Sequence, residues 1–333
     1  MAANTAAAAG PLVTVSLVTY NGMRWLPGCL ESVRAQDLPD WELLVLDNAS
    51  SDGSTGWLRD IVAQDRRMRL TALTSNLGFA AGHNKNIFAA RGEFVLLLNQ
   101  DVELDRGFLR AAVDALQGRP KVGAVQPRLR RLAAPGERTN ILDSTGLLMY
   151  RDRRVVSRRQ GEREHNVDLV PGPVWGADGP APVYRQAALL SARVPKTRGR
   201  WEVLDEDFFM YKEDVDLAWR LRILGWQTWY EPTAVAWHAR AAGARRARSL
   251  LDVAHASRLI PRWIKILSWR NQRLMQIKNE RLEDLMPDIA WVARRELLSL
   301  AFIVLADPSR LVALRGFLWY AARAWRRRSA LRL

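Results

Sequence analysis

The chain has 333 residues, of which 48% are hydrophobic and 26% charged, so it can bury a core and is not a largely disordered protein. Its single cysteine, Cys29, excludes a disulfide scaffold and a cysteine-based zinc site and favours a reducing compartment. No apolar run reaches the ~20 residues that span a bilayer. Residues 1–10 lack the basic and apolar regions of a signal peptide, and we expect a disordered tip there.

The charge is distributed unevenly along the chain. Residues 1–238 carry 30 basic and 28 acidic side chains, a net charge of +2, whereas residues 239–333 carry 20 basic and 7 acidic side chains, a net charge of +13. A basic region of this kind can bind nucleic acid, anionic lipid or a phosphorylated substrate. Composition alone leaves these three open.

Predicted strands and helices alternate over the first 125 residues. Strands are indicated by apolar, β-branched runs, and helices by apolar residues spaced three or four apart. The predicted strands lie at residues 13–19, 41–46, 70–73, 94–98 and 122–125. The predicted helices lie at residues 25–34, 55–64 and 109–116. This alternation is typical of a mostly parallel α/β sheet.

The following residues are less regular. Residues 130–172 are polar and rich in arginine, and we expect a two-stranded excursion or a long loop there. A helix is predicted to begin near Glu213, followed by strands at residues 228–230 and 234–237. We find no internal repeat.

Polar clusters follow three of the predicted strands, at residues 20–21, 47–48 and 99–101. The carboxyl ends of strands in an open parallel sheet face the ligand crevice. Each cluster by itself can equally be a turn or a helix cap. All three together favour a ligand site at this edge of the sheet.

Residues at the ends of two predicted strands could provide metal ligands. Asp101 follows a buried strand, with Glu103 two residues later, and a carboxylate there could bind Mg²⁺ or Mn²⁺ together with the diphosphate of a nucleotide sugar. His238 also follows a predicted strand, which permits a ligand role, although a lone histidine is more often a core residue. Acidic loop residues are common, so neither position is specific by itself.

Three carboxylates, Glu213, Asp214 and Asp216, lie at the predicted start of a helix. They can simply stabilise the helix dipole, and we favour this interpretation for Asp216. A carboxylate in a cleft can also take a proton from an attacking hydroxyl. Residues 75–84 (SNLGFAAGHN) offer backbone amides to a diphosphate at another helix start, without matching a Walker or Rossmann pattern.

Six segments together resemble family 2 glycosyltransferases. They are, in chain order, VSLVTYN, VLDNASSDGS, SNLGFAAGHN, LLLNQDVEL, DEDFFMYKEDVDLAWRLRILGW and EPTAVAWH. More narrowly, they resemble the bacterial rhamnosyltransferase-like branch that builds lipid-linked polysaccharides. The resemblance covers residues 12–240 and implies a GT-A fold, in which helices flank a mostly parallel, Rossmann-like α/β sheet. We therefore expect a GT-A domain at residues 11–240 and a basic helical region at residues 241–333.

The same resemblance implies an inverting transfer from a nucleotide-diphospho-sugar, with dTDP-rhamnose as the best guess, assisted by Mg²⁺ or Mn²⁺. Asp214 would be the general base, with Glu213 beside it. Asp101 and His238 would bind the metal, with Glu103 as a helper. Six residues would contact the donor: Tyr20, Asp47, Asn76, Gly82, Asn84 and Asn99.

One segment departs from the family pattern. Family members have a glycine, a small residue and an apolar run before a tyrosine–arginine pair. Here the segment at residues 176–185 reads GADGPAPVYR, and the additional Asp, Gly and Pro change the side of the site that would face the acceptor. His83 and Lys85 in the donor segment are also unusual for the family.

The basic tail mixes Arg, Leu, Ala and Trp, and its apolar runs at residues 297–306 and 311–325 are too short to span a bilayer. We expect amphipathic helices in a membrane interface, with Trp319 and Trp325 as anchors. An ordinary helical subdomain and a contact in a homo-oligomer are the alternatives. The membrane interpretation places the protein in the cytoplasm, at the inner face of the cytoplasmic membrane, where a polyprenyl-diphosphate-linked saccharide acceptor would be.

Two other functions fit the sequence less well. A nucleotidyltransferase of related fold would need a basic, glycine-rich phosphate loop near the N-terminus, which LVTYNG lacks. A nucleic-acid-binding protein would explain an isoelectric point near 10.8. The excess charge is confined to the tail, however, and no nucleic-acid-binding motif occurs, so we expect no nucleic-acid partner.

Overall fold

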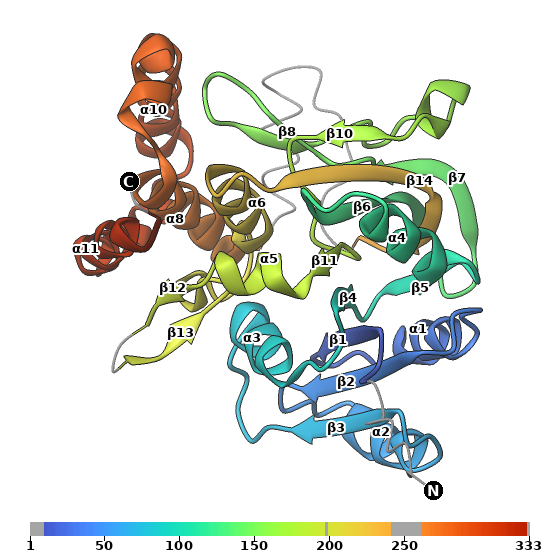
Figure 1. Ribbon diagram of the computed structural model, residues 1–333. Helices are drawn as coiled ribbons and strands as arrows, with labels where there is room; N and C mark the ends of the chain where they lie inside the picture. Colours follow the sequence, from blue (N-terminus) through green and yellow to red (C-terminus); the bar gives the residue numbers. More distant parts are fainter. Residues whose placement is uncertain (1–9, 197–198, 241–260, 332–333) are drawn as a thin grey trace, which may run out of the picture.

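The computed structural model describes residues 10–196, 199–240 and 261–331 (Figure 1). At its centre, a ten-stranded sheet has the order β10-β14-β6-β11-β4-β1-β2-β3, with β5 paired to β14 and β7 paired to β6. The sheet is mixed, because β11 runs antiparallel to both of its neighbours. The predicted α/β class is confirmed, and the parallel arrangement holds among β1 to β4.

The N-terminal half alternates between strands and helices, as predicted. Its strands are β1 (Val13–Thr19), β2 (Trp41–Asp47), β3 (Met68–Ala72) and β4 (Phe94–Asn99). Its helices are α1 (Leu26–Arg34), α2 (Ser54–Val62) and α3 (Phe79–Ala89). Every residue of β1 and β2 is buried, including the polar residues Thr14, Ser16 and Glu42, as expected of strands that are covered on both faces.

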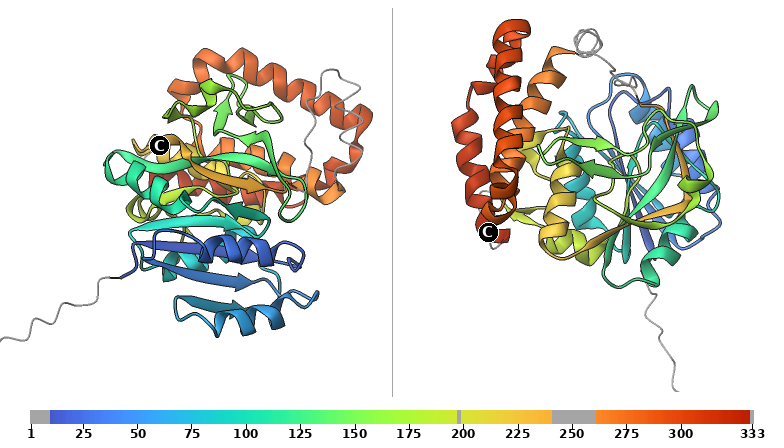
Figure 2. Two further views of the ribbon diagram at one scale, coloured as in Figure 1. Left: turned by 90° about the vertical axis from the view of Figure 1, so that its right-hand side faces the viewer. Right: turned by 90° about the horizontal axis from the view of Figure 1, so that it is seen from above.

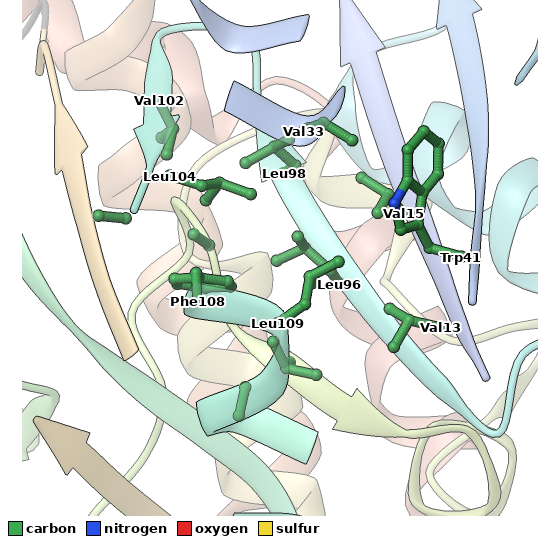
Figure 3. Close-up of a cluster of buried hydrophobic side chains, with 14 of the residues drawn as sticks. Val13, Val15, Val33, Trp41, Leu96, Leu98, Val102, Leu104, Phe108 and Leu109 are labelled. Atoms are coloured by element: carbon green, nitrogen blue, oxygen red, sulfur yellow. The ribbon is translucent and has the colours of Figure 1, made fainter. Parts of the chain in front are cut away.

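Two hydrophobic clusters cover the two faces of the sheet. Phe94, Leu96 and Leu98 of β4 face α1, α2 and α4 (Phe108–Gln117), and Figure 3 shows part of this cluster around Leu96, Leu98, Phe108 and Leu109. The intervening residues of β4 face α3, α5 (Gln186–Ser191) and α6 (Glu213–Ile223). Because successive side chains of a strand point to opposite faces, β4 contributes to both cores.

The second half of the sheet contains the longer strands. Its strands are β5 (Val102–Leu104), β6 (Val122–Leu132), β10 (Gly172–Val174), β11 (Val183–Arg185) and β14 (Gln227–His238). The two strands predicted near the end of the body are one strand, β14, whose pairing with β6 shifts between Glu231 and Val235. This irregularity, next to Pro232, explains why the sequence indicated a break there.

Residues 130–172 form more regular structure than predicted. They include the end of β6, then β7 (Arg138–Ser144), β8 (Leu147–Met149), β9 (Val155–Ser157) and the short helix η1 (Asn166–Leu169). β7 pairs with β6, and β8 pairs with β9 in a separate two-stranded sheet. A second small sheet pairs β12 (Val194–Pro195) with β13 (Trp201–Glu202). Of these strands beyond β6, only β7 extends the central sheet.

Helices dominate the described part of the tail. They are α8 (Arg262–Asn279), α9 (Leu282–Leu285), η4 (Met286–Asp288), α10 (Ile289–Ala306), η5 (Pro308–Leu314), α11 (Phe317–Arg327) and η6 (Arg328–Leu331). They stand together at one side of the molecule, away from β3 (Figure 2). Among the described residues, no helix is long and apolar enough to cross a membrane. Residues 241–260, part of the predicted tail, lie outside the described ranges.

Buried ion pairs join the tail to the sheet domain. Lys278 of α8 lies 2.8 Å from Asp216 of α6 and also pairs with Asp205. Arg327 of α11 pairs with Glu202, Asp205 and Asp207, the last two at 2.6 and 2.8 Å. Asp216 therefore holds α8 against α6, which differs from the helix-dipole role that we favoured from the sequence. Part of the excess positive charge of the tail is used inside the protein.

Candidate active site

The carboxyl ends of β1, β2 and β4 meet around a cavity of about 220 Å³, which we call the strand-end pocket. It is lined by residues from each of the three predicted polar clusters, namely Tyr20, Asn48, Asn99, Gln100 and Asp101. The arrangement follows from the parallel register, which pairs Val18 with both Leu46 and Asn99. The structure thus brings together three segments that are separated by up to about 80 residues in the chain.

Two features of the strand-end pocket concern ligand binding: an unpartnered polar atom and a close approach that shapes its wall. The Oδ1 atom of Asn99 is buried and has no hydrogen-bond partner among the described residues, so a donor group on a ligand would satisfy it. Gly78 has φ of +89°, and a Cβ atom there would lie 2.5 Å from the Phe209 ring. Only glycine therefore permits the close approach of Phe209, which lines the pocket together with Met210.

The segment that carries Phe209 is strained and is held by the tail. Phe209, Tyr211 and Lys212 have φ of 63°, 70° and 72°, values that non-glycine residues seldom adopt. The Nδ2 atom of Asn271, on α8, lies 2.9–3.0 Å from the carbonyl oxygens of Phe208, Met210 and Tyr211. We call residues 209–212 the bridging segment, because it runs from the strand-end pocket to the start of α6.

Of the six residues that we expected to contact a donor, Tyr20, Asn76 and Asn99 line the strand-end pocket. Asp47 does not line it: its carboxylate accepts hydrogen bonds from Ser50 and Thr55 and organises the loop after β2. Asp47 therefore acts on the pocket only through its neighbour Asn48, whose Oδ1 accepts from the Leu77 amide.

The other two expected donor contacts are also placed inside the protein. A Cβ atom on Gly82 would lie 2.8 Å from Val18, so this glycine lets α3 pack closely on the sheet. Asn84 is buried, and it hydrogen-bonds the backbone of Val203 and Leu204. These contacts give Gly82 and Asn84 a structural role, and neither residue lines the strand-end pocket.

Asp101 and His238 lie together at the edge of the strand-end pocket. The Nε2 atom of His238 is 3.5 Å from Oδ2 of Asp101, and its Nδ1 atom is 2.8 Å from Oδ2 of Asp143. Burial lowers the pKa of His238, but the carboxylates of Asp101 and Asp143 outweigh it and raise the pKa above its usual value. A histidine oriented by a carboxylate on one nitrogen, with its other nitrogen beside a second carboxylate, suits a divalent cation.

The described residues contain no group of three or more His, Cys, Asp or Glu side chains placed to hold a metal ion. A cation at Asp101 and His238 would thus need further oxygen ligands from a substrate and water, as is common for Mg²⁺. Glu103 does not point to this pair. Its carboxylate accepts from the Gly136 amide at 2.8 Å and from Arg138 at 3.2 Å, so we leave it out of the candidate metal site.

Glu213 and Asp214 lie at the first positions of α6, as predicted. Burial, with Asp178 as the second cause, raises the pKa of Asp214 to about 6. Burial and the adjacent Asp214 raise the pKa of Glu213 further, to about 8. The Asp214 carboxylate accepts from the amides of Val215 and Gly179, at 2.8 and 3.2 Å. Near neutral pH, Asp214 is therefore mostly ionised and able to accept a proton, whereas Glu213 is mostly protonated.

A chain of charged groups connects the two parts of the site. Arg240 lies 2.7 Å from Asp143 and 3.6 Å from Asp178. Asp143 in turn holds His238, and Asp178 lies beside Asp214. Sequence reasoning did not assign roles to Asp143, Asp178 or Arg240. Asp178 lies in the segment that departs from the family pattern, and this departure was the one available signal.

A mixed α/β sheet, a pocket with polar side chains at its strand ends, a carboxylate–histidine pair and a half-buried carboxylate at the start of α6 define the class of GT-A nucleotide-sugar transferases. Residues 14–188, more than half of the chain, match the family model described as glycosyl transferase family 2. The chain belongs to this family.

Individual relatives agree with this assignment. The chain is 28% identical over 269 residues to the N-acetylglucosaminyl-diphospho-decaprenol L-rhamnosyltransferase of Mycobacterium tuberculosis, covering 73% of this chain and 81% of that protein. It is 24% identical over 227 residues to the poly-beta-1,6-N-acetyl-D-glucosamine synthase of Staphylococcus epidermidis, covering 68% of this chain and 49% of that protein. Both matches are consistent with a glycosyltransferase.

Two solved structures show the same fold. The mannosyltransferase PcManGT from Pyrobaculum calidifontis, in complex with GDP-Man and Mn²⁺, has a TM-score of 0.53 at 20% identity and covers 95% of this chain and 76% of its own. TarS from S. aureus, in complex with UDP-GlcNAc, has a TM-score of 0.51 at 16% identity, and the match covers 94% of this chain and 82% of the TarS chain. The predicted GT-A fold is confirmed.

Proposed function

We propose that this glycosyltransferase is metal-dependent and inverting, and that it transfers a sugar to a hydroxyl of a lipid-linked saccharide in cell-surface polysaccharide synthesis. The best candidate for the sugar is rhamnose from dTDP-rhamnose. The observation that carries the proposal is the placement of the Asp101–His238 pair beside the strand-end pocket, connected through Asp143, Arg240 and Asp178 to the half-buried Asp214. The similarity to the mycobacterial rhamnosyltransferase supports the choice of sugar and acceptor class.

In this proposal the strand-end pocket binds the nucleotide of the donor. The unpartnered Asn99 Oδ1 would accept a hydrogen bond from the nucleoside, and Tyr20 would lie against it. Asp101 and His238 would hold Mg²⁺ or Mn²⁺, which would neutralise the charge that develops on the leaving diphosphate. The Mn²⁺ in the PcManGT complex supports a divalent cation in this fold.

Asp214 would remove the proton from the acceptor hydroxyl as that hydroxyl attacks the anomeric carbon from the side opposite the leaving group. One displacement of this kind inverts the configuration and needs no covalent enzyme intermediate. Two amide hydrogen bonds fix the Asp214 carboxylate, so its orientation is set before the substrate arrives. Positioning of the two reactants would supply much of the rate enhancement.

We also propose that the tail holds the enzyme at the inner face of the cytoplasmic membrane. Large apolar side chains are exposed along α10 and α11, with Leu305 at 85% and Leu318 at 83% exposure. Others on these helices are exposed as well, including Leu297, Leu298, Val304, Trp319 and Trp325. Apolar surface of this kind, next to a basic region, fits insertion into the boundary of an anionic bilayer.

The function is tested with purified full-length protein, Mn²⁺ or Mg²⁺, and a panel of nucleotide sugars with a prenyl-diphosphate-linked N-acetylglucosamine acceptor. We expect transfer of rhamnose, with inversion, and no transfer in EDTA. Transfer of a different sugar would refute the donor assignment, and retention of configuration would refute the mechanism.

The membrane proposal has a separate test. Removal of the tail is unsuitable, because it would take Lys278 and Arg327 away from Asp205 and Lys278 away from Asp216. Instead, Leu298→Glu with Leu305→Glu should reduce co-sedimentation with phosphatidylglycerol vesicles without altering the melting temperature. Equal co-sedimentation of wild type and variant would refute α10 as the membrane contact.

A further inference from the structure

A second cavity, of about 280 Å³, lies between α8 and α10 and next to the bridging segment. Four basic side chains line it: Lys212, Lys265, Arg273 and Arg295. Ser268, Ser299 and Gln272 add polar groups, and Trp269 forms an apolar wall. We call it the cationic cavity. It belongs neither to the strand-end pocket nor to the Asp101–His238 pair.

Two of the four cations have carboxylate partners and two do not. Lys265 pairs with Asp307 at 3.0 Å, and Arg273 pairs with Glu296. Among the described residues, no carboxylate forms an ion pair with Lys212 or Arg295, and the hydrogen bond of Arg295 goes to the carbonyl oxygen of Asp152, at 3.1 Å. Burial lowers the pKa of Lys212 and Arg295 lowers it further, whereas the carboxylates of Asp214, Asp178 and Glu213 raise it. None of these three carboxylates lines the cavity. The cavity wall itself therefore presents two cations without an ion-pair partner in the described part of the chain, which an anion with several oxygens would balance.

The position of the cationic cavity identifies the kind of anion. Lys212, which lines the cavity, immediately precedes Glu213 and Asp214 and interacts with the charge of both carboxylates, although neither lines the cavity. Another side of the cavity is formed by α10, through Arg295 and Ser299, and the exposed apolar side chains follow along the same helix. A ligand that matches this order has a hydroxyl-bearing sugar, then a strongly anionic group, then an apolar chain.

We propose that the cationic cavity binds the diphosphate of the lipid-linked acceptor, with its sugar directed to Asp214 and its prenyl chain directed along α10. This inference rests on the proposed function and adds to it a binding site for the acceptor. Arg295 provides a planar donor group suited to phosphate oxygens, and Lys212 provides a point charge beside the base. Bound in this way, the diphosphate fixes one end of the sugar ring while Asp214 accepts a proton at the other.

The test compares binding of farnesyl diphosphate and farnesol to the full-length protein by calorimetry. EDTA is present, so that metal-dependent binding of a diphosphate in the strand-end pocket does not contribute. We expect wild type to bind farnesyl diphosphate more tightly than farnesol. Arg295→Gln should lower the affinity for farnesyl diphosphate by ~10-fold to 100-fold, the usual range for loss of a charged hydrogen bond. The affinity for farnesol should not change.

Arg294→Gln is the matched control, because Arg294 is the neighbouring residue on α10, is exposed and does not line the cationic cavity. It removes the same charge and should leave farnesyl diphosphate binding unchanged. Phosphatidylglycerol vesicles separate a specific diphosphate site from general attraction to anionic lipid. The inference is overturned if both variants reduce farnesyl diphosphate and vesicle binding equally, or if Arg295→Gln alters neither.

Transfer assays separate this inference from the proposed function. Arg295→Gln should raise the KM for a prenyl-diphosphate-linked acceptor and should leave the KM for the donor unchanged. If wild type transfers sugar to that acceptor and Arg295→Gln has the same KM, the cationic cavity is not the diphosphate site, and the function stands. If farnesyl diphosphate binds in an Arg295-dependent manner without transfer to such an acceptor, the site stands, and the proposed acceptor is wrong.

Discussion

Replacement of Asp178 by asparagine should move the acid limb of the pH–activity profile to lower pH. Burial raises the pKa of Asp214 to about 6, with the charge of Asp178 as the next cause. Asparagine has nearly the same shape but no charge, so the variant removes the Asp178 contribution and leaves the burial. Asp214 remains above its ordinary pKa of 3.8 but becomes easier to ionise.

The magnitude follows from the usual effect of a neighbouring carboxylate, about one pKa unit, or ~1.4 kcal/mol. At pH 5, a base with a pKa near 6 is ionised in about one molecule in ten, and a base with a pKa near 5 in about half of them. Asp178→Asn should therefore retain about fivefold more of its plateau kcat/KM at pH 5 than wild type does.

The assay is kcat/KM against pH, from pH 4.5 to 8, for wild type, Asp178→Asn and Asp178→Glu. The glutamate variant keeps the negative charge, so its acid limb should stay near that of wild type even if its plateau is lower. The reasoning is refuted if the acid limb of Asp178→Asn coincides with that of wild type, or if both variants move it equally.

Three further predictions concern other parts of the site and the tail. Asp214→Asn should lower kcat by ~10²–10⁴-fold with little change in donor affinity; wild-type turnover in this variant, with an inactive Glu213→Gln, would show that the base is misassigned. Asp101→Ala and His238→Ala should each weaken Mn²⁺-dependent binding of a nucleoside diphosphate in calorimetry, and unchanged metal dependence in both would reject the pair as ligands. Lys278→Met should lower the free energy of unfolding in urea by ~3–5 kcal/mol, because it removes one positive charge from a buried ion-pair network. Arg327 still pairs with Asp205 and Arg220 with Asp216, but the network then carries an uncompensated negative charge. A loss below about 1 kcal/mol would contradict the role of Lys278 in holding the tail.

Much of the sheet could be predicted because its strands carry an unambiguous pattern. β1, β2 and β4 are rich in apolar and β-branched residues and are followed by polar residues, and both their positions and their shared edge agree with the prediction. β14 was divided in two because Pro232 and the irregular pairing around it look like a strand end in the sequence. The pattern of a strand records burial, whereas an irregularity in its pairing depends on the neighbouring strand.

The candidate site was less predictable at the level of single residues. Gly82 and Asn84 lie in a segment with the right motif, but contacts to Val18 and Leu204, far away in the chain, decide what they do. The opposite case is Asp178, which lies where the sequence departs from the family pattern and whose effect on Asp214 depends on the fold that places it nearby. The sequence motifs therefore predict where the site lies, whereas the role of a single residue depends on its contacts with residues distant in the chain.

The hold of Asn271 on the bridging segment has a consequence for attempts to exchange donor specificity between relatives. The segment that closes the strand-end pocket is not self-supporting: its left-handed residues are kept in place by an amide from the tail. A chimera that combines the sheet domain of one enzyme with the helices of another would separate the segment from its support. Residues 209–212 and α8 should therefore be transplanted together if the graft is to keep the strand-end pocket formed.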